Sequence, residues 1–143
     1  MAVLQQVQDD AAAALKAGDR ERAGALRLIV SELQKAEKEG ASDEIAVLQR
    51  ERKRRVEAAE AYEKAGRGDL AEGERREVEL IEPYLPAQLG EDELAALVDD
   101  AVAHTGATSP ADMGQVMGTV MPKVGGRADG KRVSAAVKER LQQ

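Results

Sequence analysis

Residues 83–89 read Pro-Tyr-Leu-Pro-Ala-Gln-Leu and interrupt a chain that is otherwise patterned as helices. Each proline disfavours helical geometry in the residue before it, so a helix that reaches residue 82 cannot continue through this stretch. On both sides apolar residues recur with the helical period, and no run of strict alternation is long enough for a strand. We therefore expect an all-α protein with an N-terminal helical hairpin or bundle domain, residues 1–86, and a small C-terminal three-helix domain, residues 87–143.

Glycines and capping residues divide the N-terminal part into four helices. Gly66 is expected just after a helix end, and Asp69 is expected as the N-cap of the next helix. Ser42 or Asp43 starts the third helix, and the short turn that follows it predicts antiparallel packing of the third and fourth helices. The apolar face of the first helix includes Leu15. The expected helices cover about residues 2–17, 20–39, 43–65 and 70–82.

Three further helices are expected after the break. The first covers about residues 91–104. Residues 109–112, Ser-Pro-Ala-Asp, combine an N-cap, a proline at the first helical position and an acid two residues later, which is a variant of the capping box. Pro122 is expected to end or distort the second of these helices. Asp129 is expected to cap the third, about residues 130–142.

The composition points to a helical protein of a reducing compartment. The chain has 143 residues, of which two are Tyr and none is Phe or Trp, so the core is built from aliphatic residues and Ala. There is no Cys, which excludes disulfides and thiolate chemistry. The start carries no basic n-region, and no apolar run approaches the roughly 20 residues of a membrane span. We expect a cytoplasmic protein with no membrane partner.

Charge is distributed unevenly along the chain. The net charge of −6 argues against strong unaided binding to nucleic acid, and no DNA partner is expected. Residues 90–112 hold six acids and no Lys or Arg, whereas residues 113–143 hold six bases and two acids, a net +4. We call residues 113–143 the basic C-terminal region.

No constellation of residues points to catalysis. A hydrolase or transferase needs an activated nucleophile, a base or a metal. Histidine occurs once, as His104 near a helix end, where the helix dipole favours it. There is no H-E-x-x-H motif and no Cys/His cluster, so we expect no catalytic residue, no metal and no cofactor. An enzymatic role in its own right is kept only as a third alternative to the two roles below.

The glycine-rich loop at residues 125–131 has two interpretations. It precedes a helix, whose N-terminus favours a phosphate or another anion. The glycine spacing is not that of a P-loop, and Val133 and Arg132 stand where a Ser or Thr would be required. The other interpretation is a tight turn.

The basic run at residues 50–55 also has two interpretations. On a helix, Arg52 and Arg55 fall within the apolar stripe, where a basic residue usually pairs with a carboxylate or covers the core with its stem. Carboxylates of the fourth helix are the expected partners: Glu74, Glu77 and Glu79. The alternative is that the run forms part of a binding surface.

Four stretches together resemble a known family. Residues 65–74 match A-G-R-x-D-L-A-x-x-E, residues 84–89 match Y-L-P-x-x-L, and residues 112–117 match D-M-G-x-V-M. Residues 126–130 match G-R-A-D-G. In order and spacing these motifs resemble those of the YqeY family across nearly the whole chain. One departure is Gly90, where the family commonly has a Ser N-cap, and glycine caps nearly as well.

The resemblance implies an all-α fold whose C-terminal domain is similar to the tail of the B subunit of tRNA-dependent Asp/Glu amidotransferase. That tail helps to hold tRNA while a separate region converts the misacylated aminoacyl group. The present chain is too short for that region and has no nucleotide-binding motif. A label of carbon–nitrogen ligase activity with glutamine as amido-N-donor would therefore be inherited by homology, and we do not expect the activity in this chain alone.

Two roles follow from the sequence. The first is a non-catalytic accessory protein that binds tRNA, or a protein related to tRNA aminoacylation, by phosphate and shape contacts. The second is a helical protein-interaction module unrelated to tRNA, with an adaptable methionine surface at Met113, Met117 and Met121. The predicted RNA- or anion-binding residues are Arg127, Lys131, Arg132 and Lys138, and a candidate second surface comprises Arg27, Lys53, Arg55 and Arg67.

Overall fold

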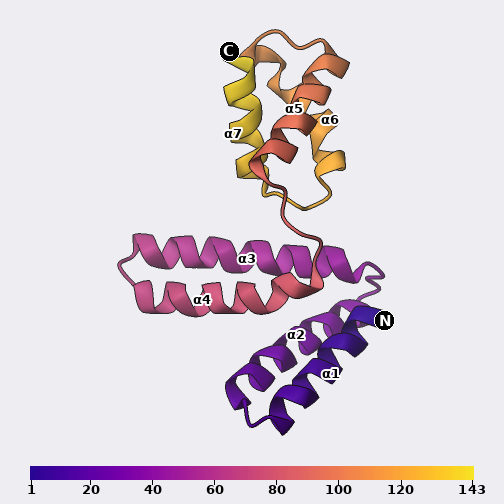
Figure 1. The fold of residues 1–143 in the computed structure, drawn as a ribbon, viewed down its shortest axis with the longest axis vertical. Helices are drawn as coiled ribbons and strands as arrows, with labels where there is room; N and C mark the ends of the chain where they lie inside the picture. The colour runs from indigo at the N-terminus through magenta and orange to yellow at the C-terminus, as the bar shows by residue number, and fades with distance from the viewer. The chain divides into compact units, whose positions relative to one another are not determined.

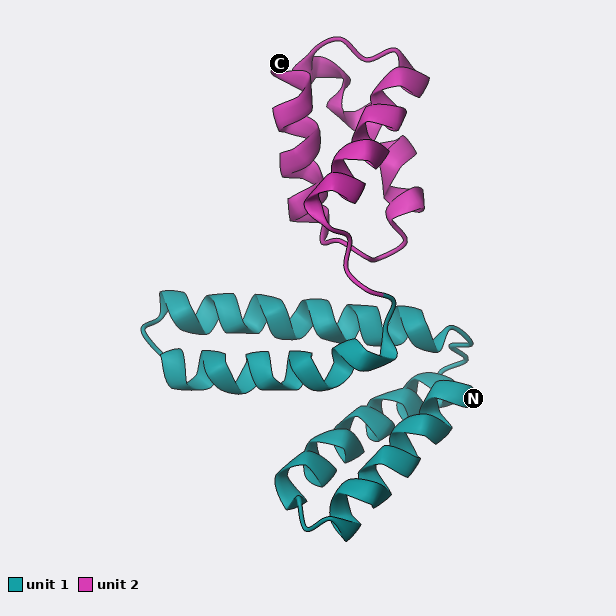
Figure 2. Ribbon diagram, in the orientation of Figure 1, with its two compact units in different colours: residues 1–86 teal, residues 87–143 magenta.

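The protein is built from helices without strands, which confirms the expected all-α fold. The computed structural model describes residues 1–143, which form two compact units, residues 1–86 and residues 87–143 (Figures 1 and 2). Unit 1 contains α1 (Ala2–Lys16), α2 (Arg20–Lys38), α3 (Glu44–Lys64), α4 (Gly68–Ile81) and the 3-10 turn η1 (Glu82–Tyr84). Unit 2 contains α5 (Glu91–Thr105), the 3-10 turn η2 (Pro110–Asp112), α6 (Met113–Val124) and α7 (Gly130–Leu141).

Unit 1 consists of two helical hairpins, α1–α2 and α3–α4 (Figure 1). The antiparallel packing predicted for α3 and α4 is confirmed. Leu26, Leu33 and Leu48 are fully buried between the helices, so aliphatic side chains form the core as the composition predicts. Leu15 is an exception: it was expected on the buried face of α1 but is 47% exposed, because the core stripe of α1 ends at Ala14, one residue earlier.

The turn between α3 and α4 contains the predicted left-handed glycine. Gly66 has φ +75°, and its N–H donates to the Glu63 carbonyl while the N–H of Arg67 donates to the Tyr62 carbonyl. These two bonds make a Schellman motif, which satisfies the last carbonyls of α3. The expectation for Asp69 is wrong, because α4 already begins at Gly68.

Asp69 therefore lies in the first turn of α4 rather than at its N-cap. Arg67 occupies the N-cap position without a capping side-chain bond, and its guanidinium instead contacts the Asp69 carboxylate at 3.3 Å. The hydrogen bond from Arg67 lowers the pKa of the Asp69 carboxyl. An acid in the first turn of a helix is favourable whether or not it is the cap.

Two polar contacts attach α1 to the second hairpin of unit 1 and to η1. The carboxylate of Glu44, in the first turn of α3, accepts the backbone N–H groups of Val3 and Leu4 at 3.2 and 2.7 Å. It thereby caps α1, whose own N-cap residue makes no side-chain bond. The hydroxyl of Tyr84 donates to the carboxylate of Asp10 in α1. The two contacts attach α1 to the start of α3 and to η1.

Unit 2 is a three-helix domain with a core rich in valine. Six valines of α5, α6 and α7 are almost fully buried: Val98, Val116, Val120, Val124, Val133 and Val137. The capping sequence at 109–112 is confirmed, since the Asp112 carboxylate accepts the N–H groups of Thr108 and Ser109.

Of the two effects expected of Pro122, an end or a distortion of α6, the first is wrong. The helix continues through Pro122 to Val124 and stops at Gly125, which has φ +58°. A proline removes one hydrogen bond to the preceding turn, and a last turn anchored by the buried side chain of Val124 tolerates that loss. A left-handed glycine is the usual way for a helix to end.

Candidate functional site

Two arginines of the basic C-terminal region hold the segment that precedes α5. Nε of Arg127 donates to the backbone carbonyl of Ala87 at 2.8 Å, and Nη1 of Arg132 donates to that of Leu89 at 2.6 Å. The N–H of Leu89 in turn donates to the carbonyl of Arg127 at 2.8 Å. These three bonds attach residues 87–89 to the start of α7, so both predicted RNA-binding arginines also have a structural role.

The two predicted lysines lie on a different side of α7. Lys131 and Lys138 are exposed and seven residues apart, so they share one side of the helix. Arg132 and Arg140 lie on the side that faces α5, where they line a cleft together with residues of that helix. The structure therefore pairs Lys131 with Lys138 and separates them from Arg132.

The acidic helix α5 offsets much of the charge of the basic C-terminal region. Nε of Arg140 donates to Asp99 at 2.7 Å, and Nη2 of Arg127 lies 3.7 Å from Glu93. Residues 87–143 hold eight acids and six bases, so the net charge of unit 2 is −2. The +4 of residues 113–143 is thus a property of one sequence segment and not of the folded unit.

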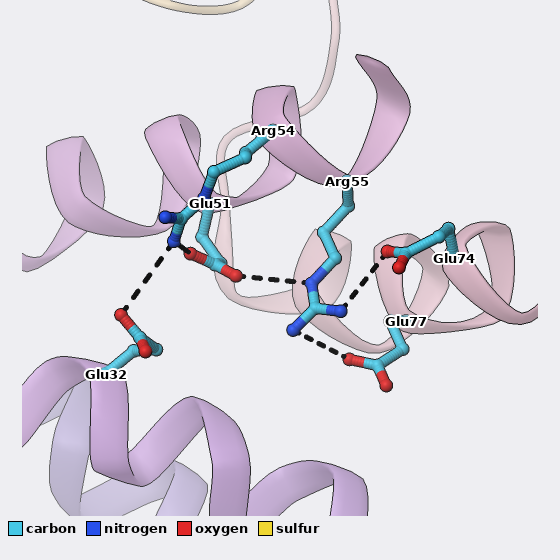
Figure 3. Close-up of polar contacts among 6 residues, drawn as sticks. All are labelled: Glu32, Glu51, Arg54, Arg55, Glu74 and Glu77. Atoms are coloured by element: carbon cyan, nitrogen blue, oxygen red, sulfur yellow. Dashed lines mark hydrogen bonds and ion pairs between the residues drawn. The ribbon is translucent and has the colours of Figure 1, made fainter. Parts of the chain in front are cut away.

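Arg55, assigned to the candidate second surface, lies inside an ion-pair network (Figure 3). It is half-buried on α3 and contacts the carboxylates of Glu51, Glu74 and Glu77, each at 3.2 Å. Burial opposes the charge of Arg55, but the hydrogen bond to Glu74 and the nearby charges of Glu77 and Glu51 outweigh it and raise its pKa. Of the two interpretations of residues 50–55, the structure shows pairing for Arg55.

Two of the three acids predicted to pair with the basic residues in the apolar stripe of α3 do so. Glu74 and Glu77 are partners of Arg55, as expected. Arg52 contacts Glu82 at 3.6 Å, an acid outside the three expected ones. No ion pair is observed for Glu79, which is exposed on α4.

The other three residues of the candidate second surface are exposed but dispersed. Arg27 lies on α2, Lys53 on α3, and Arg67 in the turn between α3 and α4. Eleven residues of α3 separate Lys53 from the end of that helix, which is roughly 16 Å along its axis. The structure therefore does not bring Lys53 and Arg67 to one site.

Glu51 is a structural residue that the sequence analysis missed. It is the only buried charged residue, with 8% of its surface exposed. Its carboxylate contacts Arg54 and Arg55, and Arg54 also lies 4.0 Å from Glu32 of α2, so the network links three helices (Figure 3). The hydrogen bond that Arg54 donates to the Glu51 carboxylate raises the pKa of Arg54. The available signal was its position three residues after Leu48, within the apolar stripe.

The glycine-rich loop forms a turn. Gly125 and Gly126 both have positive φ, and the N–H of Arg127 donates to the carbonyl of Val124. Asp129 occupies the N-cap position of α7, as expected, although its side chain makes no capping bond.

Two of the three methionines of α6 belong to the core of unit 2. Met113 and Met117 are partly buried against it, whereas Met121 is 36% exposed. The adaptable methionine surface is thus reduced to one side chain.

The side chains that could act in acid–base catalysis or bind a metal ion are dispersed. His104 is exposed near the end of α5. No three His, Cys, Asp or Glu side chains are grouped in a way that would hold a metal ion. None of the helices combines the length and apolar character that crossing a membrane requires.

One comparison with known proteins gives a match. The model of the family YqeY, described as Yqey-like protein, matches residues 4–141. No curated protein matches the chain. The family match extends over both units and all seven α-helices.

Proposed function

The chain belongs to the YqeY family, and on this basis we propose that it is a non-catalytic accessory protein of the cytoplasm that binds tRNA through unit 2. The family resemblance to the amidotransferase B-subunit tail supports this role. The contact surface is the side of α7 that carries Lys131 and Lys138. Arg127 and Arg132 hold the start of α7 in position, so the proposed phosphate contacts are those of Lys131 and Lys138.

The observation that carries the proposal is the separation of charge on α7. Lys131 and Lys138 lie outside the lining of the cleft with α5, while Arg132 and Arg140 line it beside acids of α5. A phosphate backbone that approaches from the lysine side meets positive charge before it meets the carboxylates. Because unit 2 carries a net −2 and only two lysines make the contact, binding is weak and its dependence on salt is shallow.

The test is a titration of tRNA at low salt with two variants of equal charge. We expect Lys131→Glu/Lys138→Glu to abolish binding, and the control Lys35→Glu/Lys64→Glu, on exposed positions of unit 1, to retain most of it. With two phosphate contacts, the slope of log K against log salt is about −1.4 to −1.8. Absence of binding by the unaltered chain, or equal loss in both variants, contradicts the proposal and favours the module unrelated to tRNA.

Catalysis has its own test. Given glutamine, ATP and misacylated tRNA, we expect the purified chain alone to produce no amidated aminoacyl-tRNA. Turnover that a point substitution in this chain removes would contradict the non-catalytic role.

A further inference from the structure

The cleft between α5 and α7 has an apolar floor, three alanines in its walls and a rim of charged and polar side chains. It measures about 540 Å³. Leu94 and Val98 of α5 form its base and are almost fully buried, while Ala95, Ala135 and Ala136 form its walls. Alanine walls allow the backbone of another helix to approach closely, as in packed helix pairs. We call this cleft the α5–α7 groove.

Two hydrogen bonds show the length and direction of the groove. Arg132 contacts Leu89, just before α5, and Arg140 contacts Asp99, eight residues into α5. The two helices therefore run in the same direction, with residues 91 and 132 at one end and residues 99 and 140 near the other. Eight helical residues span about 12 Å, which is just over two turns.

The rim of the groove is acidic at both ends. Glu91 and Asp92 lie at one end, and Glu139 lies near the other, next to Arg140. These three carboxylates are exposed and make no ion pair. The two arginines of the groove, in contrast, are held by Leu89 and Asp99.

Helix stability does not explain Glu139. It lies in the last turn of α7, where the helix dipole disfavours an acid and favours a base. Its carboxylate is exposed and makes no ion pair within the chain, so it is accessible to a cation that approaches the groove from outside.

We propose that the α5–α7 groove binds a basic amphipathic helix of a partner protein. The helix has a short stripe of apolar residues, which fills the alanine-walled hollow, and Lys or Arg residues about two turns apart, which meet Glu91 and Asp92 at one end and Glu139 at the other. Packing of this helix against α5 and α7 extends the three-helix unit toward a four-helix bundle. Lys131 and Lys138 are outside the lining of the groove but lie next to it, because Ala135 of the groove wall is between them on α7.

The test uses a designed probe and the full chain. The probe is a fluorescent peptide of about 16 residues, which is long enough to be partly helical in water. It carries a stripe of Ala and Leu with two lysines on each side of the stripe, and the two lysines of each pair are about eight residues apart. The control peptides are a twin with Glu in place of Lys and a scrambled peptide of the same composition. We expect binding of the probe at least tenfold tighter than that of either control, by fluorescence anisotropy.

Two protein variants locate the contact. Glu91→Gln/Asp92→Asn/Glu139→Gln should weaken binding of the probe at least tenfold, whereas Glu37→Gln/Glu57→Gln/Glu72→Gln, an equal charge change at exposed positions of unit 1, should weaken it less than threefold. Ala95→Trp, on the α5 wall of the groove, fills the groove without changing charge and should also abolish binding. Circular dichroism confirms that each variant remains helical.

Several results would overturn the proposal. They are equal binding of the acidic or scrambled peptide, equal effects of the two triple variants, and unchanged binding by Ala95→Trp. A dimer of the chain that Ala95→Trp dissociates would assign the groove to a second copy. Loss of tRNA binding in Ala95→Trp would assign it to RNA. Because Lys131→Glu/Lys138→Glu leaves the groove intact, failure of tRNA binding and failure of peptide binding are distinguished.

Discussion

Arg132 and Leu89 are joined by a hydrogen bond of 2.6 Å across 43 residues of chain. The bond closes unit 2, because it ties the segment that enters α5 to the first turn of α7. It also changes the interpretation of a residue that the sequence places in a basic binding surface. A guanidinium that already donates to a buried segment cannot be replaced without an effect on the fold.

Arg132→Met should therefore destabilise unit 2 by about 1–2 kcal/mol, since a charged hydrogen bond to a half-buried carbonyl is lost. Lys138→Met, on the same helix but exposed, should change the stability by less than about 0.5 kcal/mol. Amide hydrogen exchange measures both effects, and the N–H of Leu89, which donates to the carbonyl of Arg127, should lose protection only in the first variant. Unchanged protection of Leu89 would contradict the structural role of Arg132.

Glu51→Gln should lower the free energy of unfolding of unit 1 by about 1–3 kcal/mol, because it removes the charge that Arg54 and Arg55 share. The control is Glu57→Gln, an exposed acid of the same helix, which should have little effect. Chemical denaturation of the two variants measures the difference. If both variants unfold like the unaltered chain, the network contributes orientation without stability.

The hydrogen bond between Tyr84 and Asp10 makes the stability of unit 1 sensitive to alkaline pH. Burial, together with the hydrogen bond and charge of Asp10, raises the pKa of Tyr84 above its ordinary value of 10.0. A raised pKa in the folded state means that this stabilisation is fully present below about pH 10 and is lost as the pH rises above it.

Comparison with Tyr84→Phe isolates this contribution. The stability difference between the unaltered chain and Tyr84→Phe should be about 1 kcal/mol at neutral pH, since one hydrogen bond to a carboxylate is removed. It should remain constant up to about pH 10 and decrease at higher pH. A difference that does not change between pH 8 and pH 11 would show that the phenol is not buried in this contact.

Gly66→Val should cost on the order of 1–2 kcal/mol, because a β-branched residue is strained at φ +75°. A Cβ at this position meets no atom within 4 Å, so the cost is conformational and not steric crowding. Gly68→Val is the control, since Gly68 has space for a side chain and no positive φ. Equal melting temperatures for Gly66→Val and the unaltered chain would place the end of α3 elsewhere.

The sequence by itself determined the all-α class, the seven helices and most of their ends. The signals for these features act within one or two turns: the helical period of Leu, Val and Ala, the left-handed glycine at Gly66 and the capping sequence at 109–112. The incorrect helix ends arise where two local signals compete. Asp69 is a favourable N-cap residue, but α4 starts one residue before it. Pro122 disfavours a helix, but α6 continues through it to the buried Val124.

Apart from the pairing of Arg55 with Glu74 and Glu77, which the sequence predicts, only the tertiary structure decided which charges meet. Several contacts join residues that are 40 to 43 positions apart in the chain. They are the hydrogen bonds of Arg127 and Arg132 to backbone carbonyls, the capping of α1 by Glu44, and the pairing of Arg140 with Asp99. No local pattern encodes them, because a polar contact of this kind depends on which helix faces the residue after the core has packed. For the same reason a segment with a net +4 lies in a unit with a net −2, and Glu51, a charged residue within a basic run, is buried.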